Sequence, residues 1–182
     1  MKIKEFGPGT EGATYVGIDQ SYSGFAITFI DKEKNFYSQV YKDDGAGIDR
    51  LLRIKKFLMK NTSKKDHLLI LDVAMEGYAF GSQRANMLGE LGGMVKLCLL
   101  EELGVYPLLV PPTSLKKYAT GQGTKVSKSQ IMLSVYKKWG VDLPDDDAAD
   151  SYVLARIVAG MHETAYEKEI YTKLQDPKFR EK

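Results

Sequence analysis

The chain has 182 residues, of which 43% are hydrophobic and 27% are charged, as in an average soluble globular protein. This length favours a single domain over residues 1–182, with 1–13 as a peripheral leader and 163–182 as a peripheral tail, because one core commonly serves chains of up to about 250 residues. The composition excludes wholesale disorder, and no apolar run approaches the roughly 20 residues that cross a bilayer. We therefore expect a soluble, cytoplasmic protein that has no membrane partner.

Cysteine and histidine are too scarce for two common kinds of site. The single cysteine, Cys98, permits no internal disulfide. With only His67 and His162 beside it, no zinc ligand set can be assembled. Any metal chemistry in this chain must therefore use carboxylates.

The net charge of +2 gives no overall signal of nucleic-acid binding, but it conceals blocks of opposite sign. Residues 50–65 carry seven cations and no acid, and residues 103–141 carry six lysines and no acid. Five aspartates and no cation follow within residues 142–150. Such basic stretches are more often solvated surfaces than binding sites. Their position beside clustered carboxylates nevertheless suits an enzyme that binds a polyphosphate and cuts it with metal ions.

The first half of the chain predicts strands that end in acidic residues. After the glycine-rich start, three short runs rich in aromatic and β-branched residues are typical of an antiparallel meander: 14–19, 25–31 and 35–41. Apolar residues at helical spacing predict a helix from Ile48 to Met59. The nearly continuous apolar run 67–76 is typical of a strand buried on both faces.

The second half of the chain predicts a fifth strand at 106–110 and several helices. These helices are expected at 83–103, 113–119, 127–139 and 145–160. Gly89, Gly92 and Gly93 weaken the first helix by about 1 kcal/mol each, so we expect another backbone to pack closely there. This order of elements predicts an α/β fold with a five-stranded mixed sheet flanked by helices.

Four acidic residues stand where chemistry is expected. Asp19 and Glu76 end two predicted core strands, so they would project into the crevice where open α/β sheets usually hold their ligands. Each could instead merely start a loop. Asp147 and Asp150 lie three residues apart on the last strong helix, so their side chains point the same way.

Not every acid of the 142–150 block needs a functional explanation. Asp145 or Asp146 would cap the helix, and compensation of the helix dipole accounts for both residues. It does not account for Asp150, which lies about a turn further in among apolar residues and needs a partner. Four carboxylates without His or Cys form a hard-oxygen site suited to magnesium or manganese.

Four motifs occur along the chain in a set order. They are Val16-Gly17-Ile18-Asp19 followed by Ser23-Gly24-Phe25-Ala26, Met75-Glu76-Gly77-Tyr78, Ser127-Lys128-Ser129-Gln130, and Asp147-Ala148-Ala149-Asp150-Ser151. In order and rough spacing, from Thr14 to Gly160, they resemble RuvC-type Holliday junction resolvases. The resemblance implies a ribonuclease H-like fold, a homodimer and two magnesium ions per active site, with manganese as a substitute.

The same resemblance implies an endonuclease of DNA recombination and repair, with four-way or branched DNA as its partner and no small-molecule cofactor. Paired cuts would leave a 5′ phosphate and a 3′ hydroxyl. The family's four metal-binding carboxylates match Asp19, Glu76, Asp147 and Asp150. Its DNA-contacting lysines match Lys128, which we also expect to act in catalysis, and Lys116. A one-residue length difference leaves Lys117 as a substitute for Lys116, and Lys125 joins the expected DNA-binding residues.

The chain departs from the family pattern after the first acidic residue, and two further features concern contacts with DNA and with a second copy of the chain. Cellular members usually read Asp-Pro-Gly where this chain has Asp19-Gln20-Ser21, which suggests a diverged, phage-like branch. The family stacks an aromatic residue on an unpaired base, and either Tyr78 or Phe80 could do so or could pack in the core. The glycine-spaced segment Gly89–Leu100 is the candidate dimer interface.

Three other functions fit parts of the sequence. Gly17-Ile18-Asp19 with Gly24 also resembles the phosphate-binding hairpin of sugar kinase and actin-like ATPases, but such phosphotransferases need two lobes and a Gly-rich adenosine motif. A non-catalytic protein that binds branched DNA has no use for four converging acids, each costly to bury unpaired. A nuclease of the same fold that acts on RNA:DNA hybrids or flaps stays open.

Overall fold

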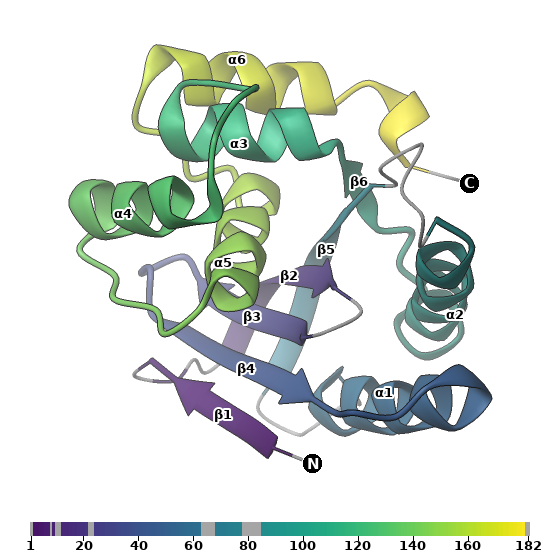
Figure 1. Cartoon of the computed structure of the whole chain (residues 1–182). Coiled ribbons are helices and arrows are strands. Elements are labelled where there is room, and N and C mark those ends of the chain that lie inside the picture. The colour runs from purple at the N-terminus through teal and green to yellow at the C-terminus, as the bar shows by residue number, and fades with distance from the viewer. Residues whose placement is uncertain are drawn as a thin grey trace.

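In the computed structural model, residues 2–7, 9, 12–21, 24–62, 68–77 and 85–180 are described. Within these ranges, six strands form one mixed sheet in the order β1-β4-β3-β2-β5-β6 (Figure 1). The strands are β1 (Lys2–Phe6), β2 (Gly12–Gln20), β3 (Phe25–Asp31), β4 (Phe36–Lys42), β5 (Leu68–Glu76) and β6 (Leu108–Val110). Strands β2 and β5, and β5 and β6, pair in parallel, whereas the other neighbours pair antiparallel. The predicted α/β fold with a mixed sheet is confirmed.

The start of the chain differs from the prediction. The segment expected to be a loose leader supplies a sixth strand, β1, which pairs with β4 from Lys2 opposite Lys42 to Phe6 opposite Ser38. Without β1, strand β4 would be an edge strand with a row of unpaired backbone groups, and pairing satisfies them. The five predicted strands are all present, with β6 shorter than expected.

Helices cover both faces of the sheet. They are α1 (Gly47–Thr62), α2 (Ala85–Leu103), α3 (Pro112–Thr120), α4 (Lys128–Trp139), α5 (Asp146–Val158) and α6 (Ala165–Leu174), with a short 3₁₀ helix η1 (Pro177–Phe179). One face packs on α5, with α3, α4 and α6 outside it, and the other packs on α1 and α2 (Figure 1). Each face buries its own apolar core. None of the described helices combines the length and the apolar character needed to cross a bilayer.

A glycine lets α5 lie directly on the central strand. A Cβ atom at Gly17 of β2 would lie 2.0 Å from the carbonyl oxygen of Ser151 and 2.3 Å from the backbone nitrogen of Ala155. These distances are too short for any side chain, so the backbones of β2 and α5 are in contact here. Because of this contact, the N-terminus of α5 lies beside the carboxyl end of β2.

Three buried hydroxyls fix how α5 is rotated on the sheet. The Thr28 hydroxyl lies 2.7 Å from that of Ser151 on α5 and 2.6 Å from that of Ser38 on β4. The Ser151 hydroxyl also donates to the carbonyl oxygen of Ala148 at 3.0 Å. Because these polar groups are buried, they must satisfy one another. The helix therefore presents one defined set of residues to the end of the sheet.

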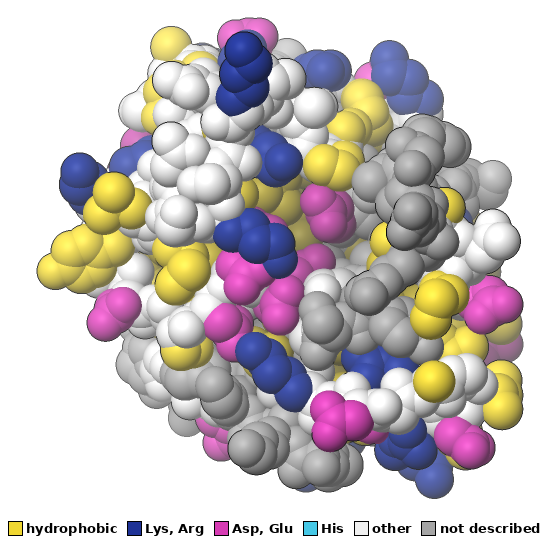
Figure 2. All heavy atoms as spheres, viewed as in Figure 1, with side chains coloured by type: hydrophobic (Ala, Val, Ile, Leu, Met, Phe, Trp, Pro, Cys, Tyr) yellow, Lys and Arg dark blue, Asp and Glu magenta, His cyan; other side chains and the backbone are white. Residues whose placement is uncertain are grey.

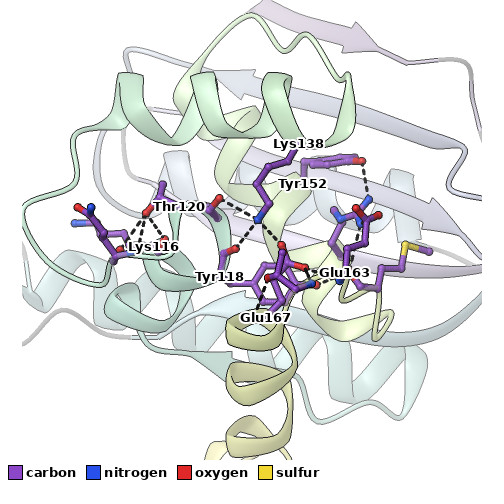
Figure 3. A network of polar contacts seen from close by, with 12 residues as sticks. Lys116, Tyr118, Thr120, Lys138, Tyr152, Glu163 and Glu167 are labelled. Carbon is purple, nitrogen blue, oxygen red and sulfur yellow. Dashed lines mark hydrogen bonds and ion pairs between the residues drawn. The ribbon is translucent and has the colours of Figure 1, made fainter.

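An ion pair between a partly buried lysine and a fully buried glutamate joins the outer helices (Figure 3). The Lys138 ammonium pairs with the fully buried Glu167 carboxylate and donates to the carbonyl oxygens of Tyr118 and Ala119 at 3.0 and 3.2 Å. The same carboxylate accepts from the backbone N–H of Thr164 at 2.9 Å, at the start of α6. One lysine thus caps the end of α3 and holds α6. Beyond it, α6 buries Ile170 and Leu174, although segment 163–182 was expected to be peripheral.

Candidate active site

Two of the predicted carboxylates lie side by side at the end of the sheet. Ile18 of β2 is opposite Met75 of β5 in parallel register, which makes Asp19 and Glu76 the next pair. Both point to the face covered by α5, because they alternate with residues that pack on α1 and α2. The side-chain N–H of Gln20 donates to the carbonyl oxygen of Glu76 at 2.8 Å and ties the two strand ends together.

The other two carboxylates come from the first turns of α5. Asp145 is the N-cap, and its carboxylate accepts from the backbone N–H of Ala148 at 3.0 Å. Asp147 is only 6% exposed and points to the sheet. A Cβ atom at Gly24 would lie 2.0 Å from one of its carboxylate oxygens, so a side chain at position 24 would displace this carboxylate. Asp150 follows almost one turn later.

Asp19, Glu76, Asp147 and Asp150 influence one another, and we refer to these four residues as the acidic cluster. Burial raises the pKa of the Asp19 carboxyl well above its usual range, and the charges of the other three members raise it further. Burial, and then Glu76, raise the pKa of Asp150 to about 7. Burial also raises the pKa of Glu76 and of Asp147. Four acids that resist ionisation together form a site that favours an added positive charge.

The donor set of the acidic cluster fits a hard divalent cation. All four side chains are carboxylates, the ligand type that magnesium and manganese prefer. One oxygen of Asp150 is buried and has no hydrogen-bond partner, which leaves it available to a cation. Among the described residues, no three His, Cys, Asp or Glu side chains are arranged so that they could hold a metal ion as they stand.

Two lysines flank the acidic cluster. Figure 2 shows acidic side chains gathered in the middle of one face, with Lys or Arg side chains above and below them. Lys128, the first residue of α4, forms an ion pair with Asp146. Lys42, the last residue of β4, lies 2.7 Å from a carboxylate oxygen of Asp145. Asp145 and Asp146 therefore do more than compensate the helix dipole, because each also holds a lysine beside the cluster.

Sequence reasoning identified Lys128 but missed Lys42. Lys128 stands in a motif, whereas Lys42 lies 103 residues before its partner Asp145. No local pattern connects these two residues. Only the pairing of β4 within the sheet could have indicated the contact.

The other three lysines that were predicted to bind DNA, Lys116, Lys117 and Lys125, lie in different surroundings. The charges of Lys116 and Lys128 both lower the pKa of Glu76, against the larger effect of its burial. Lys117 instead pairs with Glu169 of α6 at 2.9 Å. Lys125 is exposed in the loop before α4, with a φ of 56°.

Two further predictions concern the aromatic residues and the glycines of α2. Tyr78 and Phe80 lie outside the described residues. The glycines were expected to accommodate another backbone. A Cβ atom at Gly89 or Gly93 would meet none of the described residues within 4 Å, so within that part of the chain no element packs on these two glycines. Leu97 and Leu100 on the same helix are 55% and 36% exposed.

Comparisons with known proteins support the fold. No family model matches the chain, and no curated protein matches it. Among solved structures, that of Thermus thermophilus RuvC aligns over 89% of this chain and 96% of its own, with a TM-score of 0.63 and 18% sequence identity. T. thermophilus RuvC in complex with a Holliday junction substrate aligns over the same shares, with a TM-score of 0.63 and 16% identity. The predicted resemblance to RuvC, and with it the ribonuclease H-like fold, is confirmed.

Proposed function

We propose that this protein is a divalent-metal-dependent endodeoxyribonuclease that resolves four-way or branched DNA junctions. The acidic cluster carries the proposal, because four mutually repelling carboxylates at one end of the sheet are unfavourable unless a cation joins them. The RuvC-like fold supports the substrate class, since a solved structure similar to this chain holds a Holliday junction.

The residues of the site divide into metal-holding and DNA-holding groups. Asp19, Glu76, Asp147 and Asp150 would hold two magnesium ions, for which manganese could substitute. Ions bound in this way activate water and stabilise the leaving oxygen of a phosphodiester. Because burial raises the pKa values of these carboxyls, they would release protons as cations bind.

The lysines would hold the DNA beside the carboxylates. Lys128 is held by Asp146, and the charges of Asp147 and Asp19 also act on its ammonium. A phosphate next to the cut would give this ammonium a second anionic partner and would offset the charge that develops in the reaction. Against the larger effect of burial, the charge of Lys116, on α3, lowers the pKa of Glu76, and Lys116 would contact the same DNA strand as Lys128. Lys117 pairs with α6 and is the weaker candidate.

Resolution of a junction needs two cuts, so the proposal includes a homodimer. Helix α2 is the candidate contact surface, because Gly89 and Gly93 have open space above them among the described residues. Leu97 and Leu100 leave apolar surface exposed on the same helix. A twofold contact would cover these residues and would place one acidic cluster in each protomer.

A cleavage panel tests the proposed function. The purified protein is incubated with a four-way junction, a flap, an RNA:DNA hybrid and plain duplex DNA, each with and without magnesium. We expect magnesium-dependent cleavage of the junction in preference to the other three. Preferential cleavage of the hybrid or the flap would replace junction resolution by another nuclease activity of this fold. Cleavage of none of them would reject a nuclease.

A pair of variants shows whether the acidic cluster is responsible. Asp147→Asn should bind the junction and fail to cut it, because it removes one carboxylate while keeping the shape of the side chain. Asp142→Asn is the matched control, because this exposed aspartate lies in the loop before α5 and outside the cluster. Equal loss of cleavage in both variants would show that general acidity, rather than the cluster, supports the reaction.

A further inference from the structure

Lys42 occupies a place at the end of the sheet that the proposed metal site does not use. Phe25 of β3 is opposite Tyr41 of β4, so Lys42 follows at the level of Gly24. A Cβ atom at Gly24 would lie 2.0 Å from a carboxylate oxygen of Asp147 and 3.4 Å from the Cε atom of Lys42. Both side chains therefore pass over the same backbone position.

The ion pair between Lys42 and Asp145 contributes too little stability to explain a lysine at this position. The Asp145 carboxylate already caps α5 by accepting from Ala148 at 3.0 Å and already faces the positive end of the helix dipole. The Lys42 side chain is 38% exposed, and partly exposed ion pairs contribute little to stability. Its ammonium thus keeps access to solvent beside a carboxylate that is stable without it.

The surroundings of Lys42 mirror those of Lys128. Each lysine pairs with one of the two aspartates that begin α5, and Lys42 reaches them from the sheet whereas Lys128 reaches them from α4. The hydrogen bond to Asp145 raises the pKa of Lys42 despite its partial burial, and Asp147 and Asp146 add to the effect. A fully charged ammonium therefore stands on each side of the N-terminus of α5.

We propose that Lys42 is a further phosphate-binding lysine of the active site, which contacts the DNA backbone on the sheet side of the acidic cluster while Lys128 contacts it on the α4 side. The inference rests on the proposed function, because it assigns a further contact to the same DNA. Binding would exchange the carboxylate partner of Lys42 for a phosphate oxygen. The strand would then be held on both sides of the carboxylates that cut it.

The salt dependence of junction binding tests this inference. Binding of a synthetic four-way junction is measured without divalent metal, over a range of salt concentrations, for the parent protein, Lys42→Met and Lys42→Arg. Loss of one phosphate contact should reduce the slope of log affinity against log salt by about 0.9. With that slope, affinity should fall about eightfold at about 0.1 M salt and approach that of the parent near 1 M. Lys42→Arg should keep the parent slope.

Lys34→Met is the matched control for the loss of one positive charge. Lys34 lies in the turn at the other end of β3 and β4 and pairs with Glu163 at 3.0 Å, with 57% of its side chain exposed. We expect the parent slope for this variant. If Lys42→Met also keeps the parent slope, the inference is wrong and Lys42 only supports the helix cap. If the parent itself does not bind the junction, the proposed function fails instead.

Discussion

Replacing Asp150 by asparagine should stabilise the metal-free protein above neutral pH. The Asp150 carboxyl is largely buried beside Glu76, and one of its oxygens has no hydrogen-bond partner. Its ionisation in the folded protein is therefore opposed by lost hydration and by a neighbouring charge. Asparagine keeps the size of the side chain and removes the charge.

The size of the effect follows from the pKa of Asp150. Burial and the charge of Glu76 raise this pKa from 3.8 to about 7. At about 1.4 kcal/mol per pH unit, the ionised side chain costs at most on the order of 4 kcal/mol. Neighbouring groups and water rearrange around a buried charge, so we expect about half of this bound, or about 2 kcal/mol. In a chain of this length, that gain would raise Tm by about 4–8 °C.

The stability difference between Asp150→Asn and the parent should depend on pH. Because the folded-state pKa is raised, protonated Asp150 contributes stability that is fully present below pH 3.8 and is lost as the pH rises through about 7. Asparagine does not titrate, so the advantage of Asp150→Asn should be small at about pH 4 and largest at about pH 8.

Thermal unfolding in the presence of EDTA measures this difference at both pH values. Asp142→Asn removes an exposed aspartate from the preceding loop and should show no pH-dependent gain. If Asp150→Asn unfolds at a lower temperature than the parent at about pH 8, or differs from it equally at both pH values, Asp150 does not carry an opposed charge. The electrostatic reasoning for the acidic cluster would then be refuted.

Three other substitutions test separate parts of the account. Gly24→Ala would place a Cβ atom 2.0 Å from a carboxylate oxygen of Asp147. Because the Asp147 side chain can turn away, Tm should change little. Junction cleavage should slow about 100-fold, because the Asp147 carboxylate would no longer be in place to hold a metal ion. Lys116→Ala should weaken cleavage, because the Lys116 charge acts on Glu76 of the acidic cluster, whereas Lys117→Ala should not, because Lys117 faces Glu169 of α6. Equal rates for the two variants would contradict this assignment. Leu97→Glu should give a monomer in sedimentation at micromolar concentration where the parent is a dimer, and a monomeric parent would remove α2 as a contact surface.

Local sequence patterns predicted the carboxylates and their elements. Asp19 and Glu76 each end an apolar run, and parallel pairing of two such strands brings their ends to one edge. Asp150 stands among apolar residues, and this exception indicated a site. The helix that carries it begins one residue later than expected, because Asp145 is the cap.

Contacts between distant segments could not be predicted in this way. Strand β1 forms because β4 offers a free edge, and nothing within residues 2–6 indicates that edge. The pair of Lys42 and Asp145 likewise depends on the sheet order. Neighbouring residues of a helix point about 100° apart, so the helix geometry of α3 separates Lys116 from Lys117, which the sequence left as alternatives.

The central claim is that the acidic cluster cuts junction DNA with divalent metal, and Glu76→Gln tests it most directly. Single-turnover cleavage of a four-way junction is followed for the parent and for this variant, at protein concentrations that give equal fractions of bound junction. We predict that the parent makes paired cuts with magnesium and none in EDTA, while the variant binds the junction at least as tightly and cuts it more slowly by orders of magnitude. A variant that cuts at the parent rate, or a parent that cuts in EDTA, would contradict the account.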